Sequence, residues 1–485
     1  MPMSTGKNIA KNTLLVFFAR LLNSIFGFLT LIVLARYLSV EEYGKYIFVY
    51  TLISFTVLLA DLGGFHIITR EISRDKEKTK SIVGSAFTMR VLISTILLII
   101  IVLITHFMIR DSLIKTGVYI VTIPQLIFAV NTISVAVFTA NNRFGFDAML
   151  QITSRSLELL SIIMIVIFNL GFLAIFIGIG ASYLINAFLG LIVYLKNYGM
   201  PVFKYDYKYG KYLLYESLPV AITTFFSIAI LRVDVFVLKI LKGSADIALF
   251  NIPYTFIYTL SIIPLSFVSV IFPILCKLGD TEERSTFIIG YKKAFKFLYI
   301  ISLLVSIILI CFSNTILQFI YGIKFLAATD ALKIMGVSIV FLFLHSLNTY
   351  SLISIKKQHL STISTAIAFF LNLVLDLLLI PKYGYIGASI ATSVSYCICF
   401  LVSFYFVLRN LGRLNLTLTF IKPIFGTVVT ALFIVSFHNT NPFIILPISI
   451  IIYISSLIII GVFSFEDIEL VKSQLLPDRT RHIKN

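Results

Sequence analysis

The sequence predicts an all-α integral membrane protein with about fourteen transmembrane helices, arranged as two six-helix halves plus two extra C-terminal helices. Three observations predict this fold class. Hydrophobic residues make up 59% of the 485 positions and charged residues only 13%, which leaves too little polar surface to cover a soluble globule of 54.6 kDa. Apolar stretches of transmembrane length recur along the chain, and the second half repeats features of the first.

The apolar stretches are roughly 20 residues long, the length that a helix needs to cross about 30 Å of hydrocarbon. A mean hydropathy of +1.02 indicates that such stretches dominate the chain. The predicted transmembrane helices are 14–38, 46–68, 82–108, 117–140, 147–168, 172–195, 213–238, 247–272, 290–312, 331–354, 361–380, 384–408, 418–437 and 443–463.

Glycines and polar residues carry the evidence for an internal repeat, because apolar matches arise easily by chance. The offset between matching positions drifts, as expected when loops differ in length. A duplicated bundle is the usual construction of a secondary transporter. The matches include Gly6-Lys7 with Gly210-Lys211, Tyr50 with Tyr254, Asn131-Thr132 with Asn348-Thr349, and Gly180-Ala181-Ser182 with Gly387-Ala388-Ser389. The predicted organisation is an N-terminal bundle at 1–200, a C-terminal bundle at 201–410, two additional helices at 411–465 and a cytoplasmic tail at 466–485.

Lysines and arginines predict the orientation of the chain. With both termini in the cytoplasm, 25 of the 39 cations fall on the inner side and 9 on the outer side, which agrees with the positive-inside rule. The net charge of +17 therefore has a membrane explanation. Because the cations are spread over short loops and are not gathered on one face, nucleic acid is not an expected partner.

Familiar catalytic motifs are missing from the sequence. It contains no phosphate-binding G-x-x-x-x-G-K-[ST] loop and no H-E-x-x-H metal-binding helix. The four cysteines lie in or beside apolar spans without the spacing of a zinc site or a disulfide framework. We therefore expect no catalytic residues, no cofactor and no structural metal, and energy supplied by an H⁺ or Na⁺ gradient or by consumption of the substrate.

Charges inside the predicted helices mark candidate sites, because an ionisable residue near the bilayer centre costs at least about 2.5 kcal/mol without a partner or water. Arg20, Asp61 and Arg90 are expected at similar depths on three neighbouring helices. One interpretation is that Asp61 neutralises one arginine as a structural pair while the other snorkels to the interface. The other is an anion-binding pocket with one cation left for the substrate.

Further charges lie on later helices. Arg155 and Glu158 are three residues apart and can pair on one helix face. Arg232 and Asp234 are two residues apart and point in different directions, so each needs another partner or water. The predicted substrate-binding residues are Arg20, Arg90, Arg155 and Arg232. The predicted ion-coupling or charge-pairing residues are Asp61, Glu158, Asp234 and Asp376.

Three stretches together carry a family resemblance: LARYLSVEEYGKY at Leu34–Tyr46, LADLGG at Leu59–Gly64 followed by REISR, and NLVLDLLLIPKYGYIGASIATSVSY at Asn372–Tyr396. They resemble the polysaccharide (Wzx-type) flippases of the multidrug/oligosaccharidyl-lipid/polysaccharide (MOP) exporter superfamily. This resemblance implies two six-helix bundles related by a pseudo-twofold axis along the membrane normal. It also implies alternating-access transfer of a polyprenyl-linked oligosaccharide across the cytoplasmic membrane.

Such a substrate fits the charge pattern, because an anionic headgroup and its sugars need a hydrated cationic cavity. The expected partners are the lipid-linked oligosaccharide and membrane lipids, with a polysaccharide polymerase and glycosyltransferases as further candidates, and the expected state is a monomer. Three alternatives stay open. They are a multidrug/cation antiporter of the same superfamily, a flippase for the peptidoglycan lipid precursor, and a membrane glycosyltransferase or polymerase. An antiporter would be expected to place acids in its cavity, and such an enzyme to carry a large outer loop or an acidic catalytic motif.

Overall fold

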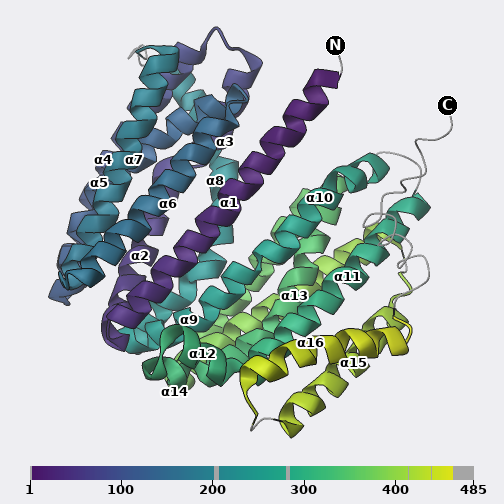
Figure 1. Cartoon of the computed structure of the whole chain (residues 1–485). Helices are drawn as coiled ribbons and strands as arrows, with labels where there is room; N and C mark the ends of the chain where they lie inside the picture. The colour runs from purple at the N-terminus through teal and green to yellow at the C-terminus, as the bar shows by residue number, and fades with distance from the viewer. Residues whose placement is uncertain (1–2, 201–206, 280–283, 413, 438–439, 463–485) are drawn as a thin grey trace, which may run out of the picture. The chain divides into compact units, whose positions relative to one another are not determined.

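The computed structural model describes residues 3–200, 207–279, 284–412, 414–437 and 440–462, and all regular structure within these ranges is helical (Figure 1). Helical backbone coincides with every predicted transmembrane segment over most of its length. Twelve helices in the described ranges are long and apolar enough to cross a membrane. The all-α membrane fold is therefore confirmed, whereas the count of fourteen crossings and the pseudo-twofold axis stay predictions. The predicted tail at 466–485 lies outside the described residues.

The helices form two compact units. The first comprises Met1–Thr259, Ile320–Ala328 and Thr365–Ala391. It contains α1 (Met3–Tyr37), α2 (Val40–Asp61), α3 (Gly64–Arg74), α4 (Thr79–Met108), α5 (Ser112–Ala140), α6 (Phe144–Ile167), α7 (Phe172–Tyr198), α8 (Tyr207–Leu241), α9 (Ser244–Leu260), the 3₁₀ helix η1 (Ile323–Ala328) and the middle of α14 (Gln358–Leu411). Within this unit α1 packs along α6, and α5 packs against α7 (Figure 1).

The second unit comprises Leu260–Phe319, Thr329–Ser364 and Thr392–Asn485. It contains α10 (Ile262–Gly279), α11 (Arg284–Cys311), most of α12 (Ser313–Tyr321), α13 (Thr329–Ser354), the two ends of α14, α15 (Thr417–Ser436) and α16 (Pro442–Ile459). Here α13 packs against α10 and α11, and α15 packs against α11 and α16. The predicted domain boundary at residue 200 stays a prediction, and residues 201–206 lie outside the described ranges.

Local sequence explains where helices begin and break. Predicted span 46–68 is divided into α2 and α3 at Leu62 and Gly63, which adopt φ values of 44° and 70°.

Asp111 caps α5 by accepting from the N–H groups of Leu113 and Ile114, and it pairs with Lys45 at 2.9 Å. Partial burial raises the pKa of Asp111, but these hydrogen bonds outweigh that effect and leave its pKa below the ordinary value.

One polar contact of the first unit recurs in the second. Asn131 on α5 donates its amide to the carbonyl of Asn186 on α7 at 3.4 Å. Its repeat partner Asn348 on α13 donates to the Ser403 hydroxyl on α14 at 3.0 Å, and both contacts join residues 55 positions apart. Buried asparagines need such partners in a membrane protein, so the internal repeat conserves a polar contact as well as a hydrophobic pattern.

Two glycines of α2 and its C-terminal break allow close helix approach. At Gly63 an added Cβ would lie 2.9 Å from the backbone of Ser217 and Ala221 on α8. At Gly44 it would overlap the carbonyl of Ser244 at the start of α9. Small residues at such crossings are typical of membrane helix packing. These two positions therefore set the separation between α2 and the α8–α9 segment.

We expect Gly44→Ala to destabilise the protein by about 1–3 kcal/mol, because the methyl group has no space against the Ser244 backbone. Gly27→Ala on α1 is the matched control, since no atom lies within 4 Å of the added Cβ there. Thermal unfolding of both purified variants in detergent measures the difference. Equal melting temperatures would contradict the close approach.

Candidate functional site

Arg90 on α4 is joined to three residues on two other helices of the first unit, α2 and α5. Its guanidinium pairs with Asp61 at 2.7 Å and donates to the Ala129 carbonyl at 2.9 Å and the Thr132 hydroxyl at 2.8 Å. The residue is only 1% exposed. An added Cβ at Gly64 would lie 3.0 Å from the guanidinium, so the small residue makes room for this charge. Three of the five N–H groups of Arg90 thus bond to protein acceptors, which favours the interpretation of Asp61 and Arg90 as a structural pair.

Arg20 on α1 lies apart from this pair. Its side chain is exposed, and it interacts electrostatically with Asp147 on α6. Arg20 forms no ion pair with Asp61 in the described part of the chain. The structure therefore brings together two of the three charges that the sequence analysis considered jointly. Arg20 remains a cation with access to the surroundings of α1.

Arg155 on α6 is the centre of a second polar group. It pairs with Glu158 at 2.8 Å, donates to the Asn23 side chain on α1 at 3.2 Å, and interacts electrostatically with the Tyr50 side chain on α2. Glu158 is buried, whereas 27% of the Arg155 side chain stays exposed. The Glu158 carboxylate is therefore enclosed by protein, whereas part of the Arg155 guanidinium remains accessible. Such a guanidinium can bind an additional anion without losing Glu158.

Arg232 on α8 lies between two tyrosines. Its guanidinium carbon is 5.9 Å from the centre of the Tyr50 ring and 5.8 Å from that of Tyr254 on α9, within cation–π range. These tyrosines are the repeat-related pair of the sequence. Arg232 forms no ion pair with a carboxylate among the described residues.

Tyr50 connects the two arginines, because its ring faces Arg232 and its side chain interacts electrostatically with Arg155. We call Arg155, Glu158, Arg232, Tyr50 and Tyr254 the arginine–tyrosine cluster. It contains two guanidinium groups and one carboxylate, drawn from α2, α6, α8 and α9. A site of this charge favours an anion, and guanidinium forks match phosphate oxygens.

Two of the predicted acids lie together elsewhere in the first unit. Asp234 on α8 accepts from the Asn372 amide on α14 at 3.2 Å. The carboxyl of Asp376, one turn beyond Asn372, is within hydrogen-bonding reach of Asp234. Asp376 is fully buried, and its oxygens accept no hydrogen bond from an amide or hydroxyl of the described residues. The two carboxyl groups form a buried acid pair inside apolar helices.

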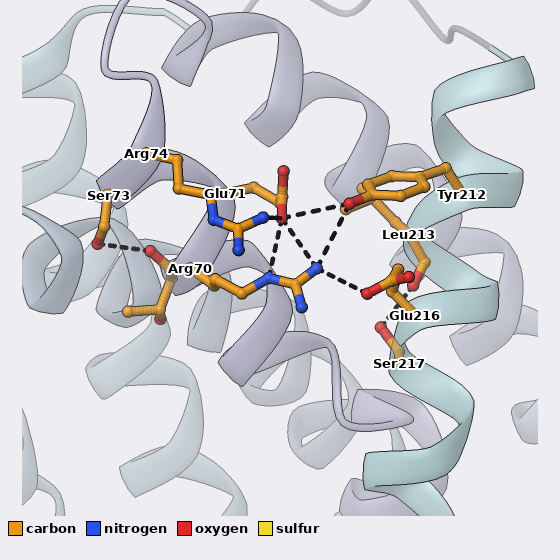
Figure 2. Close-up of polar contacts among 9 residues, drawn as sticks. Arg70, Glu71, Ser73, Arg74, Tyr212, Leu213, Glu216 and Ser217 are labelled. Atoms are coloured by element: carbon orange, nitrogen blue, oxygen red, sulfur yellow. Dashed lines mark hydrogen bonds and ion pairs between the residues drawn. The ribbon is translucent and has the colours of Figure 1, made fainter.

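A further network joins α3 to α8, as Figure 2 shows. Arg70 pairs with Glu71 on its own helix at 2.9 Å and with Glu216 on α8 at 2.8 Å. The Tyr212 hydroxyl lies 3.4 Å from both Arg70 and Glu71 (Figure 2). Arg70 and Glu216 are partly exposed, so each contact contributes little stability alone. Together they hold the end of α3 against α8 near the Gly63 crossing.

Sequence reasoning missed the aromatic and amide partners of these charges. Asn23, Tyr50, Tyr254 and Asn372 were not candidate site residues, although the repeat marked Tyr50 and Tyr254 as a matched pair. That pairing was the available signal, because polar matches between repeats are less expected by chance than apolar ones. The described residues contain no group of three or more His, Cys, Asp or Glu side chains able to hold a metal.

The fold matches solved structures of other proteins. A solved structure described as lipid II flippase MurJ in an inward closed conformation superposes with a TM-score of 0.76, at 20% identity over 96% of this chain and 99% of that one. An inward-facing multidrug resistance MATE transporter of the MOP superfamily superposes with a TM-score of 0.65, at 14% identity over 81% and 96% of the two chains. The chain therefore has the MOP transporter fold.

Sequence comparison then identifies the family. The model of the Polysaccharide biosynthesis protein family matches residues 9–279, more than half of the chain, so the chain belongs to this family. It is 23% identical to the probable low-salt glycan biosynthesis flippase Agl15 of Haloferax volcanii over 81% of this chain and 82% of that protein. It is also 26% identical to an uncharacterized membrane protein of Methanocaldococcus jannaschii, over 56% of each chain. Agl15 and the two structural neighbours are named as flippases or transporters.

We expect Arg90→Gln and Asp61→Asn each to destabilise the protein, by about 3–5 kcal/mol where a charge is left buried without its partner. The double variant should lose less than the sum, because two neutral amides leave no uncompensated charge. Thermal unfolding of the two single variants and the double variant gives the coupling energy. Additive losses would contradict a structural ion pair.

Proposed function

We propose that this protein is a flippase that moves a polyprenyl-linked oligosaccharide across the cytoplasmic membrane, with the arginine–tyrosine cluster as its headgroup site. The observation that carries the proposal is the placement of Arg155 and Arg232 around Tyr50 with Glu158 as the one acid of the cluster. Membership of the polysaccharide biosynthesis family and the likeness to Agl15 support the substrate class.

The chemistry of the substrate matches the cluster. A polyprenyl pyrophosphate glycan carries negative charge where the sugar joins the lipid, and neither charge nor sugar crosses hydrocarbon unaided. Guanidinium groups bind phosphate oxygens with two parallel hydrogen bonds. Tyrosine presents an apolar ring with a hydroxyl at its edge, which suits the mixed surface of a sugar. The lipid chain stays in the membrane while alternating access carries the headgroup across.

Charge argues against the cation antiporter, because a cluster with excess guanidinium repels a cationic drug. The peptidoglycan lipid-precursor flippase is the second candidate, since MurJ has the same fold and its named substrate, lipid II, has a related anionic link. A membrane glycosyltransferase or polymerase is disfavoured, because the family and fold neighbours are transporters. We further propose cytoplasmic termini, a monomer, and polymerase and glycosyltransferases as neighbours in the pathway.

Replacement of both cluster arginines tests the headgroup site. We expect Arg155→Gln and Arg232→Gln each to reduce transport about tenfold or more, because each removes one charge-assisted contact. The assay is surface glycan restored in a host that lacks its own polysaccharide flippase, at equal membrane abundance. Lys333→Gln is the control, since Lys333 forms an exposed pair with Asp330 on α13. Full restoration by the Arg155→Gln, Arg232→Gln double variant would refute the cationic site.

We also propose that the Asp234–Asp376 pair couples transport to a H⁺ or Na⁺ gradient. Two carboxylates in hydrogen-bonding reach inside a low-dielectric bundle cannot both stay ionised without a counter-ion. The pair therefore holds one proton or a monovalent cation, and the Asn372 amide orients Asp234. Loading and release of this ion would give the contact between α8 and α14 in the first unit two charge states.

For the coupling pair we expect Asp376→Asn to abolish the dependence of transport on the gradient. Transport of a fluorescent lipid-linked oligosaccharide in proteoliposomes, with pH and Na⁺ gradients imposed separately, identifies the ion. Asp330→Asn, an exposed acid on α13, is the control. A gradient response that survives in Asp376→Asn would exclude the pair as the coupling site.

A further inference from the structure

A groove in the first unit is lined by none of the residues of the arginine–tyrosine cluster. Its volume is about 450 Å³, in the range of small-molecule sites, and it lies among α4, α5 and α7. On α4 the lining residues Val83, Phe87 and Val91 are spaced by four and therefore share one helix face. Ala187 and Leu191 form part of the α7 wall. The groove is almost entirely apolar.

Bulky apolar side chains at the groove are exposed on the surface of the first unit. Val91 on α4, Ile127 on α5, and Phe188 and Leu191 on α7 all line it and are all exposed. All three helices are long and apolar enough to cross a membrane. Water in such a groove has few polar partners, so hydrocarbon is the favoured filling. The groove therefore suits a single lipid chain.

One polar group at the groove lacks a partner. Tyr194 on α7 lines the groove and is only 3% exposed, and its hydroxyl has no hydrogen-bond partner among the described residues. A buried hydroxyl without a partner costs free energy, roughly 1–3 kcal/mol in proteins. A ligand with an ester or phosphate oxygen at this position would remove that cost. This observation favours a lipid with a polar end over a plain hydrocarbon.

A cation marks the same end of the groove. The Tyr194 ring stacks on Tyr198, one helical turn further on, with centroids 5.6 Å apart. The Arg143 guanidinium lies 5.9 Å from the centre of the Tyr198 ring. Arg143 is exposed, and within the described residues its guanidinium donates one hydrogen bond, to the Asn197 side chain at 2.7 Å. Its other N–H groups are available to an anion at the membrane surface.

We propose that this groove binds one chain of an anionic phospholipid, with the phosphate at Arg143 and the ester region beside Tyr194. The polyprenyl carrier lipid of the proposed substrate is the less favoured occupant, because its anionic end is assigned to the arginine–tyrosine cluster. In this respect the inference rests on the proposed function. The bound phospholipid fills the surface between α4, α5 and α7 and holds these helices together.

Native mass spectrometry of the purified full-length protein tests the site. The protein is equilibrated with phosphatidylglycerol or phosphatidylcholine of identical chains, and retained lipid is counted. We expect one retained lipid, with phosphatidylglycerol preferred about fivefold because one cation contacts its headgroup. Ala187→Phe and Leu191→Trp fill the groove and should remove retention of both lipids. Arg143→Gln should remove the preference and leave chain binding.

The control is Lys115→Gln near the start of α5, at the end remote in sequence from Arg143, which should change nothing. Leu191 is exposed, so its replacement tests the groove even where Ala187→Phe fails to fold. Unchanged retention in the well-folded Leu191→Trp variant overturns the proposal, and so does equal retention of the two lipids by the intact protein. Displacement of phosphatidylglycerol by an equal concentration of polyprenyl phosphate assigns the groove to the carrier lipid instead. None of these readouts measures transport, so their failure is distinct from failure of the flippase proposal.

Discussion

The cost of placing charge in hydrocarbon is the constraint on which this structure depends. A guanidinium or carboxylate inside the bilayer must find a partner, face water or change its protonation state. Arg90 meets this constraint through Asp61, Ala129 and Thr132, which together accept three of its five N–H groups. The small Gly64 leaves the space that the guanidinium occupies, because an added Cβ there would lie 3.0 Å from it.

The same constraint separates structural charges from candidate functional ones. In the arginine–tyrosine cluster, Glu158 is buried while Arg155 stays partly exposed, and Arg232 is held by two aromatic rings. Cation–π contacts position a guanidinium without neutralising it. A cluster built in this way keeps its net positive charge for an anionic ligand. The Asp234–Asp376 pair is the opposite case, because it concentrates acid where only a proton or cation relieves the repulsion.

The repeat adds a second level of organisation. Asn131 and Asn348 bond across helices at the same sequence separation within their own units. Tyr50 and Tyr254 are also repeat partners, yet they converge on one arginine within the first unit. A duplicated element thus serves two purposes here. Asn131 and Asn348 each make a packing contact within their own unit. Tyr50 and Tyr254 instead form two walls of a single site around Arg232.

The sequence by itself determined the all-α membrane fold, the positions of the helices and the residues that carry charge within them. These features are local, because a run of apolar residues needs only its own length to cross a bilayer. Tertiary structure alone decided which charges and polar groups meet between helices. Arg155 and Glu158 share a helix face, but Asn23, Tyr50 and Arg232 join them from other helices, and Asp376 reaches Asp234 across 142 positions. Such contacts depend on helix rotation and packing, which periodicity does not specify.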